Sequence, residues 1–155
     1  MNSRKIKNTI IDQMLAETIE DAKNCTDNIL LFTQSLGESL SIDDFSKNDL
    51  LTLEKAYRRM CRDRKFTSEF PQDYFEYLMT LYIGEWLIRN KKAKWFGYKG
   101  KYHTQSPILI QFENSKSVDI RAICIDLVDS KSIQGARDEK ALLVFCERAE
   151  KIALL

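Results

Sequence analysis

Apolar side chains cover nearly the whole circumference of one predicted helix. When residues 71–92 are placed on a helix, almost every side carries an apolar residue, including Tyr74, Tyr77, Leu81, Trp86 and Ile88. A helix that is apolar nearly all round is buried. The pattern therefore predicts a central helix over residues 71–92, with the other segments packed around it.

A long amphipathic stretch begins the chain. Residues 4–36 place apolar or small side chains at alternating spacings of four and three, which is typical of one helical face. We favour a break near residues 24–27, because Thr26 and Asp27 are good N-cap residues and Gly37 is a good C-terminal cap. A coiled-coil seam would show the same spacing, but packing against the domain's own core explains the Thr and Cys positions better.

A second helix is predicted from a capping signal. Ser46 is followed three residues later by Asp49, the pattern in which each side chain bonds the other residue's backbone N–H. One face of this helix carries Leu50, Leu53, Tyr57, Met60 and Cys61. The helix ends in the basic stretch 58–65, where cations favour the negative end of the helix dipole.

The pattern becomes strand-like after the central helix. Residues 93–98 and 107–112 are rich in aromatic and β-branched side chains, and residues 113–116 form a turn before a short strand at 117–118. A small antiparallel sheet is therefore predicted over about residues 93–118.

Two further helices follow the sheet. Apolar residues spaced by threes and fours indicate one helix after Asp119, including Ile120, Ile123 and Leu127, and another over residues 138–154. The whole pattern predicts one α+β domain over residues 1–155, mainly helical, with the small sheet packed on the central helix.

Charge and cysteines limit the function classes. The chain has 155 residues with 24 Lys and Arg against 23 Asp and Glu, so no global field attracts nucleic acid or an anionic membrane. Residues 1–55 hold 6 basic and 10 acidic side chains, whereas residues 56–103 hold 11 and 5. Four scattered cysteines without a CxxC motif and the lack of a long apolar run predict a reduced, cytoplasmic protein without a membrane span.

The candidate chemistry is sparse. His103 is the only histidine and lies in a polar stretch between two predicted strands, where we interpret it as a solvated loop residue. No phosphate-binding glycine motif and no spaced set of metal ligands occurs. We therefore predict no catalytic residue, no cofactor and no metal.

Glu85 is the one acidic residue inside the apolar arc of the central helix. Arg89 follows at i+4, the favourable orientation for a helical ion pair. We expect Glu85, Arg89 and Trp95 to be structural, with Trp95 anchoring the first strand on the helices. The alternative is a small enzyme that uses Glu85 as an acid or base with a raised pKa.

Two basic groups lie in the middle of the chain. One comprises Arg58, Arg59, Arg62, Arg64 and Lys65, and the other comprises Lys91, Lys92, Lys94, Lys99 and Lys101. Together they could form a face that binds a phosphate backbone, with neighbouring aromatic residues for stacking. A nucleic-acid-binding module is therefore a second alternative, less favoured because of the near-zero net charge.

Residues 77–130 resemble small bacterial domains of uncharacterised families. The shared features are a Gly-Glu pair on a helix, a following Arg, a Trp that opens a strand and a Pro before the next strand, here Gly84, Glu85, Arg89, Trp95 and Pro107. Such domains often look like immunity proteins of polymorphic toxins. The resemblance implies a protein-binding role and supplies no catalytic residues.

We therefore predict a cytoplasmic immunity protein that occludes a cognate toxin, with an oligomeric state that the sequence leaves open. Interface anchors are enriched in Tyr, Trp and Arg. The candidate partner-binding residues lie at a helix end and in a loop: Arg62, Arg64, Tyr98, Tyr102 and His103.

Overall fold

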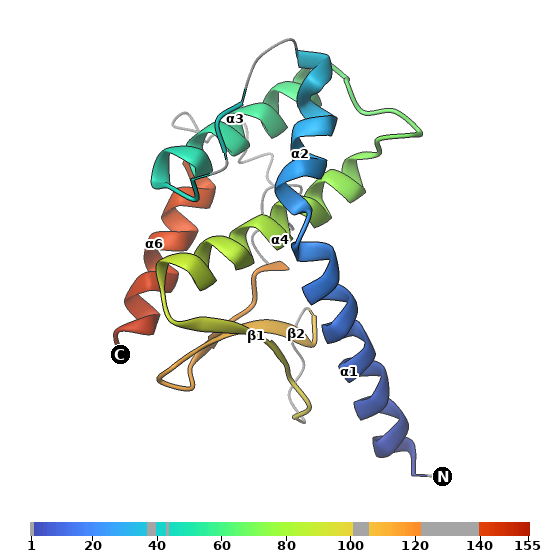
Figure 1. Cartoon of the computed structure of the whole chain (residues 1–155), viewed down its shortest axis with the longest axis vertical. Helices are drawn as coiled ribbons and strands as arrows, with labels where there is room; N and C mark the ends of the chain where they lie inside the picture. The colour runs from blue at the N-terminus through green and yellow to red at the C-terminus, as the bar shows by residue number, and fades with distance from the viewer. Residues whose placement is uncertain (1, 37–39, 43, 101–105, 122–139) are drawn as a thin grey trace.

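The central helix organises the fold. The computed structural model describes residues 2–36, 40–42, 44–100, 106–121 and 140–155, and Figure 1 shows α4 (Gln72–Asn90) crossing the middle of the molecule. Helices α2 (Cys25–Thr33) and α3 (Lys47–Arg62) lie on one side of α4, and the sheet lies on the other. Helix α6 (Ala141–Ala153) runs beside its C-terminal half. The predicted α+β fold is confirmed.

Helix α4 is buried over most of its length. Its fully covered residues are Phe75, Leu78, Met79, Leu81, Tyr82, Ile83, Gly84, Trp86 and Leu87. Each large apolar side chain buried in this way stabilises the fold by roughly 1.5–3 kcal/mol. The prediction was wrong at Tyr74 and Tyr77, which are 41% and 37% exposed. Both lie in the first two turns of α4, where the helix buries only Phe75 and Leu78.

The predicted break in the first helical stretch is confirmed. Helix α1 (Ser3–Ala22) ends before α2 begins at Cys25, and a short 3-10 turn, Gln34–Leu36, follows α2. Asn24 occupies the N-cap position without a side-chain hydrogen bond, so the expectation that Thr26 or Asp27 caps this helix was wrong. The start of α2 is fixed instead by burial, because Cys25 and Ile29 face the core. Gly37 lies outside the described residues.

Helix α3 begins with the predicted capping box. Ser46 Oγ accepts a hydrogen bond from the Asp49 backbone N–H, and Asp49 Oδ2 accepts one from the Ser46 backbone N–H, both at 3.1 Å. Leu50, Leu53, Tyr57 and Met60 are buried as predicted. Cys61 is exposed, contrary to the prediction, because the buried face ends within the last turn of α3.

The sheet has the predicted antiparallel strands in the order β1-β2-β3. Strand β1 (Ala93–Gly97) pairs with β2 (Ile108–Phe112), and β2 pairs with β3 (Ser117–Val118). The register places Trp95 opposite Ile110. The helix predicted after Asp119 lies almost entirely in residues 122–139, outside the described residues.

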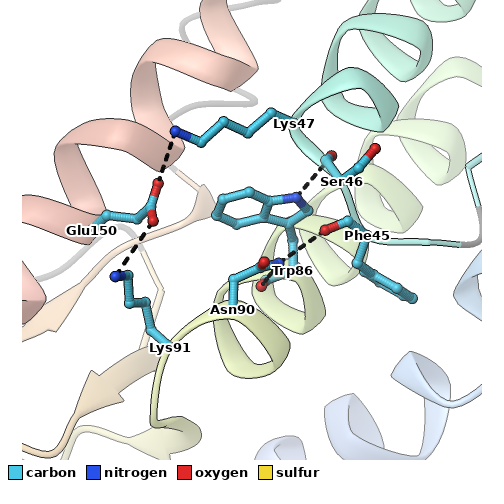
Figure 2. Close-up of polar contacts among 7 residues, drawn as sticks. All are labelled: Phe45, Ser46, Lys47, Trp86, Asn90, Lys91 and Glu150. Carbon is cyan, nitrogen blue, oxygen red and sulfur yellow. Dashed lines mark hydrogen bonds and ion pairs between the residues drawn. The ribbon is translucent and has the colours of Figure 1, made fainter.

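A group of polar contacts fastens the C-terminal half of α4 to its neighbours (Figure 2). Trp86 Nε1 donates to the Ser46 carbonyl at 3.0 Å, and Asn90 Nδ2 donates to the Phe45 carbonyl at 3.0 Å. On α6, the Glu150 carboxylate lies between Lys47 at 3.8 Å and Lys91 at 3.5 Å. These contacts join the start of α3, the end of α4 and α6.

A buried ion pair within α3 is linked to α6 by a hydrogen bond. Glu54 is fully buried and accepts hydrogen bonds from Arg58 Nε at 2.9 Å and from the Leu142 backbone N–H at 2.7 Å. Leu142 lies in the first turn of α6, so Glu54 satisfies one of the backbone donors that a helix leaves free there. Arg58 therefore does not belong to the predicted basic surface group.

No helix in the described ranges is long and apolar enough to cross a membrane.

Candidate binding cleft

A cleft of about 480 Å³ lies between α1, the N-terminal half of α4 and the sheet. This volume falls within the roughly 300–1,000 Å³ typical of ligand pockets. Its described lining residues come from segments far apart in the sequence: Met14, Glu17, Thr18, Asp73, Glu76, Tyr77, Thr80, Leu81, Trp95, Ser106, Ile108, Ile120 and Arg121.

Carboxylates predominate among the charged groups of the cleft. Glu17 projects from α1, and Asp73 and Glu76 lie one turn apart on α4. Arg121 is the single cation in the described part of the lining. The cleft is therefore acidic, although the chain as a whole carries a net charge of +1.

Glu76 is held in place by a buried tyrosine. Tyr57 Oη donates to Glu76 Oε2 at 2.9 Å and accepts a hydrogen bond from Gln72 Nε2 at 3.1 Å. Burial raises the pKa of Glu76, the Tyr57 hydrogen bond opposes this, and the charge of Asp73 raises it further. Burial and a like-charged neighbour both disfavour the ionised form of Glu76. A bound cation would therefore stabilise the Glu76 carboxylate.

The cleft also has an apolar side. Leu81, Ile108 and Ile120 are buried beneath it, and the Trp95 indole packs against Gly84 of α4. A β-carbon at position 84 would overlap the Trp95 ring. The glycine therefore lets the strand residue approach the helix closely enough to form the cleft floor.

Exposed apolar residues continue from the cleft along α1. Ile6 and Ile10 are 45% and 51% exposed, and they precede the cleft residue Met14 at successive spacings of four. Residues four apart lie on the same side of a helix. At the C-terminal end of α1, Asp21 Oδ2 accepts a hydrogen bond from Tyr77 Oη at 2.6 Å, which ties α4 to α1.

The three predicted partner-binding residues that the structure describes do not share one surface. Arg62 and Arg64 are exposed at the end of α3, whereas Tyr98 follows β1 and donates its backbone N–H to Pro107. In Figure 1, the end of α3 lies at the top of the molecule and β1 near the bottom. Arg62 instead lines a second recess of about 300 Å³ with Lys55 and Arg59. Tyr102 and His103 lie outside the described residues.

The predicted structural residues meet around α4. Arg89 lies over the Phe45 ring, with the guanidinium carbon 4.1 Å from the ring centre. Burial raises the pKa of Glu85, and the charge of Arg89 and the Trp95 indole N–H lower it. Trp95 Nε1 is buried and forms no hydrogen bond within the described residues, so its N–H acts on Glu85 through the field of its dipole.

The cleft residues were missed in the sequence, although one signal was present. Asp73, Glu76 and Thr80 are spaced by three and four, which gives the otherwise apolar central helix one polar stripe. A polar stripe on a buried helix predicts a solvated or functional face. The contributions of α1 and the sheet have no such local signal, because they depend on tertiary packing.

The cleft has the composition of a binding site for a group that is both apolar and positively charged. No three His, Cys, Asp or Glu side chains lie close enough to hold a metal ion within the described residues. Carboxylates beside aromatic and aliphatic side chains instead suit a cation carried on a hydrocarbon stem.

The comparisons with known proteins place the sequence in a family. The family described as "Uncharacterised protein YwmA" matches residues 21–137, a range that includes all of α2, α3, α4 and the sheet. No curated protein and no solved structure matches the chain. The family match covers well over half of the sequence, and the chain therefore belongs to the YwmA family.

Proposed function

We propose that the protein binds a partner protein through the α1–α4–sheet cleft and the apolar side of α1. In its most specific form, the proposal is a cytoplasmic immunity protein that neutralises a cognate bacterial toxin by occlusion. The observation that supports this proposal most directly is that the side chains of Ile6 and Ile10 are exposed on α1 and continue to Met14, which lines the cleft. Contiguous exposed apolar surface beside polar groups is characteristic of interaction sites.

The distribution of charge supports a protein partner over a nucleic acid. The carboxylates Glu17, Asp73 and Glu76 would repel a phosphate backbone. Several lysines of the second basic group already have acidic partners within the chain. Lys91, Lys92 and Lys99 form ion pairs with Glu150, Glu113 and Asp12. The remaining basic residues of the first group lie in the last turn of α3 or just after it, and α3 and the sheet are on opposite sides of α4 (Figure 1).

The geometry gives less support to an enzyme based on Glu85. Glu85 does not belong to the described lining of the cleft. Its neighbours Trp95 and Arg89 pack against the fold, as expected of a structural residue. Binding by occlusion needs only a complementary surface, and the cleft with its apolar flank provides one.

The toxin-neutralising form rests on the resemblance carried by Gly84, Glu85, Arg89 and Trp95, together with this surface. The first test is whether a large toxin reading frame lies immediately upstream of the gene. Co-expression of the two products should then restore growth that the toxin alone prevents.

A pull-down with that upstream product tests the surface. The Ile10→Asp variant should lose binding at least tenfold, because a charge replaces an apolar contact. Val144→Asp is the matched control, since Val144 is 42% exposed on α6, away from the cleft. Equal binding by both variants would reject the cleft surface, and failure of the wild type to bind would reject the toxin partner.

A further inference from the structure

We propose that the cleft receives one arginine or lysine side chain of the partner, with its aliphatic stem against the apolar floor and its charged end at the carboxylates. This inference rests on the proposed protein-binding function and specifies the chemistry of the bound segment.

The charges face the cleft from two helices. Glu17 lies on α1, and Asp73 and Glu76 lie on α4, so an inserted cation would have carboxylates on both walls. Arg121 is the one described group of opposite sign. A single anionic wall would attract cations in general, whereas two walls define a position between them. Complementary charge of this kind fixes which segment of a partner enters.

The uncharged part of the cleft suits a hydrocarbon stem. Met14, Leu81 and Trp95 provide aliphatic and aromatic surface beside the carboxylates. Arginine and lysine bury their stems on such surface while the charged end remains with polar partners. An aromatic ring within about 6 Å adds a favourable cation–π contact, and both Trp95 and Tyr77 line the cleft. A purely apolar side chain would bring no opposite charge to the carboxylates that line the cleft.

The position and the pKa of the Glu76 carboxylate both favour contact with a cation. Its position is fixed by Tyr57, and its raised pKa shows that burial disfavours the ionised form when the cleft holds no cation. An entering cation reverses that effect, so binding should strengthen as pH rises through the pKa of Glu76. Among the described residues, the other titratable or charged groups around it are Asp73 and Tyr77 on the same helix, Glu17 and Asp21 on α1, Tyr57 and Cys61 on α3, and Arg121 after β3.

The probe for the test is the peptide acetyl-Leu-Arg-Leu-amide, compared with the same peptide containing citrulline. Citrulline has nearly the shape of arginine without its charge. Titration into the ¹⁵N-labelled full chain should shift the backbone signals of Thr18, Thr80 and Leu81 with the arginine peptide. The citrulline peptide should bind at least tenfold more weakly.

Variants localise the effect. Glu76→Gln and Glu17→Gln should each weaken binding of the arginine peptide several-fold, and Glu17 is exposed, so its variant tests the site even if Glu76→Gln disturbs folding. Glu147→Gln on α6 is the control and should bind as the wild type does. Equal binding of the two peptides, or shifts outside the cleft only, would overturn the inference.

The two proposals fail separately. If Ile10→Asp abolishes capture of the toxin while neither peptide binds the cleft, the partner surface stands and the inserted cation is rejected. If the arginine peptide binds as expected and the upstream product does not, the cleft chemistry stands and the toxin partner is rejected.

Discussion

At the residue scale, Gly84 and Trp95 show how one position sets the packing of two elements. The sequence predicts that Trp95 anchors the first strand on the helices, and in the structure the Trp95 ring lies directly against Gly84 of α4. The sequence also predicts that Glu85 lies within the buried arc, and it is half-buried. It does not predict that Arg89 stacks on Phe45, because Phe45 precedes it by more than forty residues.

Gly84→Ala should destabilise the protein. Alanine favours a helix over glycine by about 1 kcal/mol, but a β-carbon at this position overlaps the Trp95 ring. Overpacking of this kind costs about 1–3 kcal/mol, so we expect a net loss in the free energy of unfolding measured in urea. In a Trp95→Leu background the same substitution should cost less. Equal costs in both backgrounds would contradict the proposed contact.

Glu85→Gln should change how stability depends on pH. Burial raises the Glu85 pKa above its ordinary value of 4.5, so the folded wild type holds more protons than the unfolded chain between the two pKa values. Wild-type stability from this group therefore falls as pH rises through that window, and glutamine lacks this loss. Urea unfolding at about pH 4 and about pH 7 should show the variant gaining relative to the wild type at the higher pH. A gain at the lower pH would contradict this sign.

At the element scale, the signals that the sequence displays are local ones. The capping box of Ser46 and Asp49 spans three residues and was therefore predictable, as were the break between α1 and α2 and the three strands. The cap of α6 is different, because Glu54 reaches the Leu142 backbone across 88 residues. The sequence places Arg58 in a basic surface group because the burial of Arg58 and of its i,i+4 partner Glu54 depends on tertiary packing.

The Glu54–Arg58 pair should show strong coupling. Arg58→Met leaves the Glu54 charge buried without its ion-pair partner, and removing one partner of a buried pair costs about 3–5 kcal/mol. Glu54→Leu also removes the hydrogen bond to α6. The double variant should lose less free energy of unfolding in urea than the sum of the two single variants. Additive losses would show that the pair does not act as a unit.

At the scale of the whole molecule, the cleft arises from segments that the sequence separates widely. Met14, Glu76 and Ile120 meet only because α1 and the sheet both pack against α4. The polar stripe of α4 could have indicated one wall, and the remaining walls had no local signature. The predicted contacts Arg62, at the end of α3, and Tyr98, just after β1, belong to elements on opposite sides of α4 (Figure 1).

The most direct test of partner binding through the cleft is hydrogen–deuterium exchange of the chain with and without the upstream toxin product. We predict slower exchange in the complex over α1 and the first half of α4, and unchanged exchange at Arg62 and Arg64. Slower exchange confined to the end of α3, with α1 and α4 unchanged in a formed complex, would contradict the proposal.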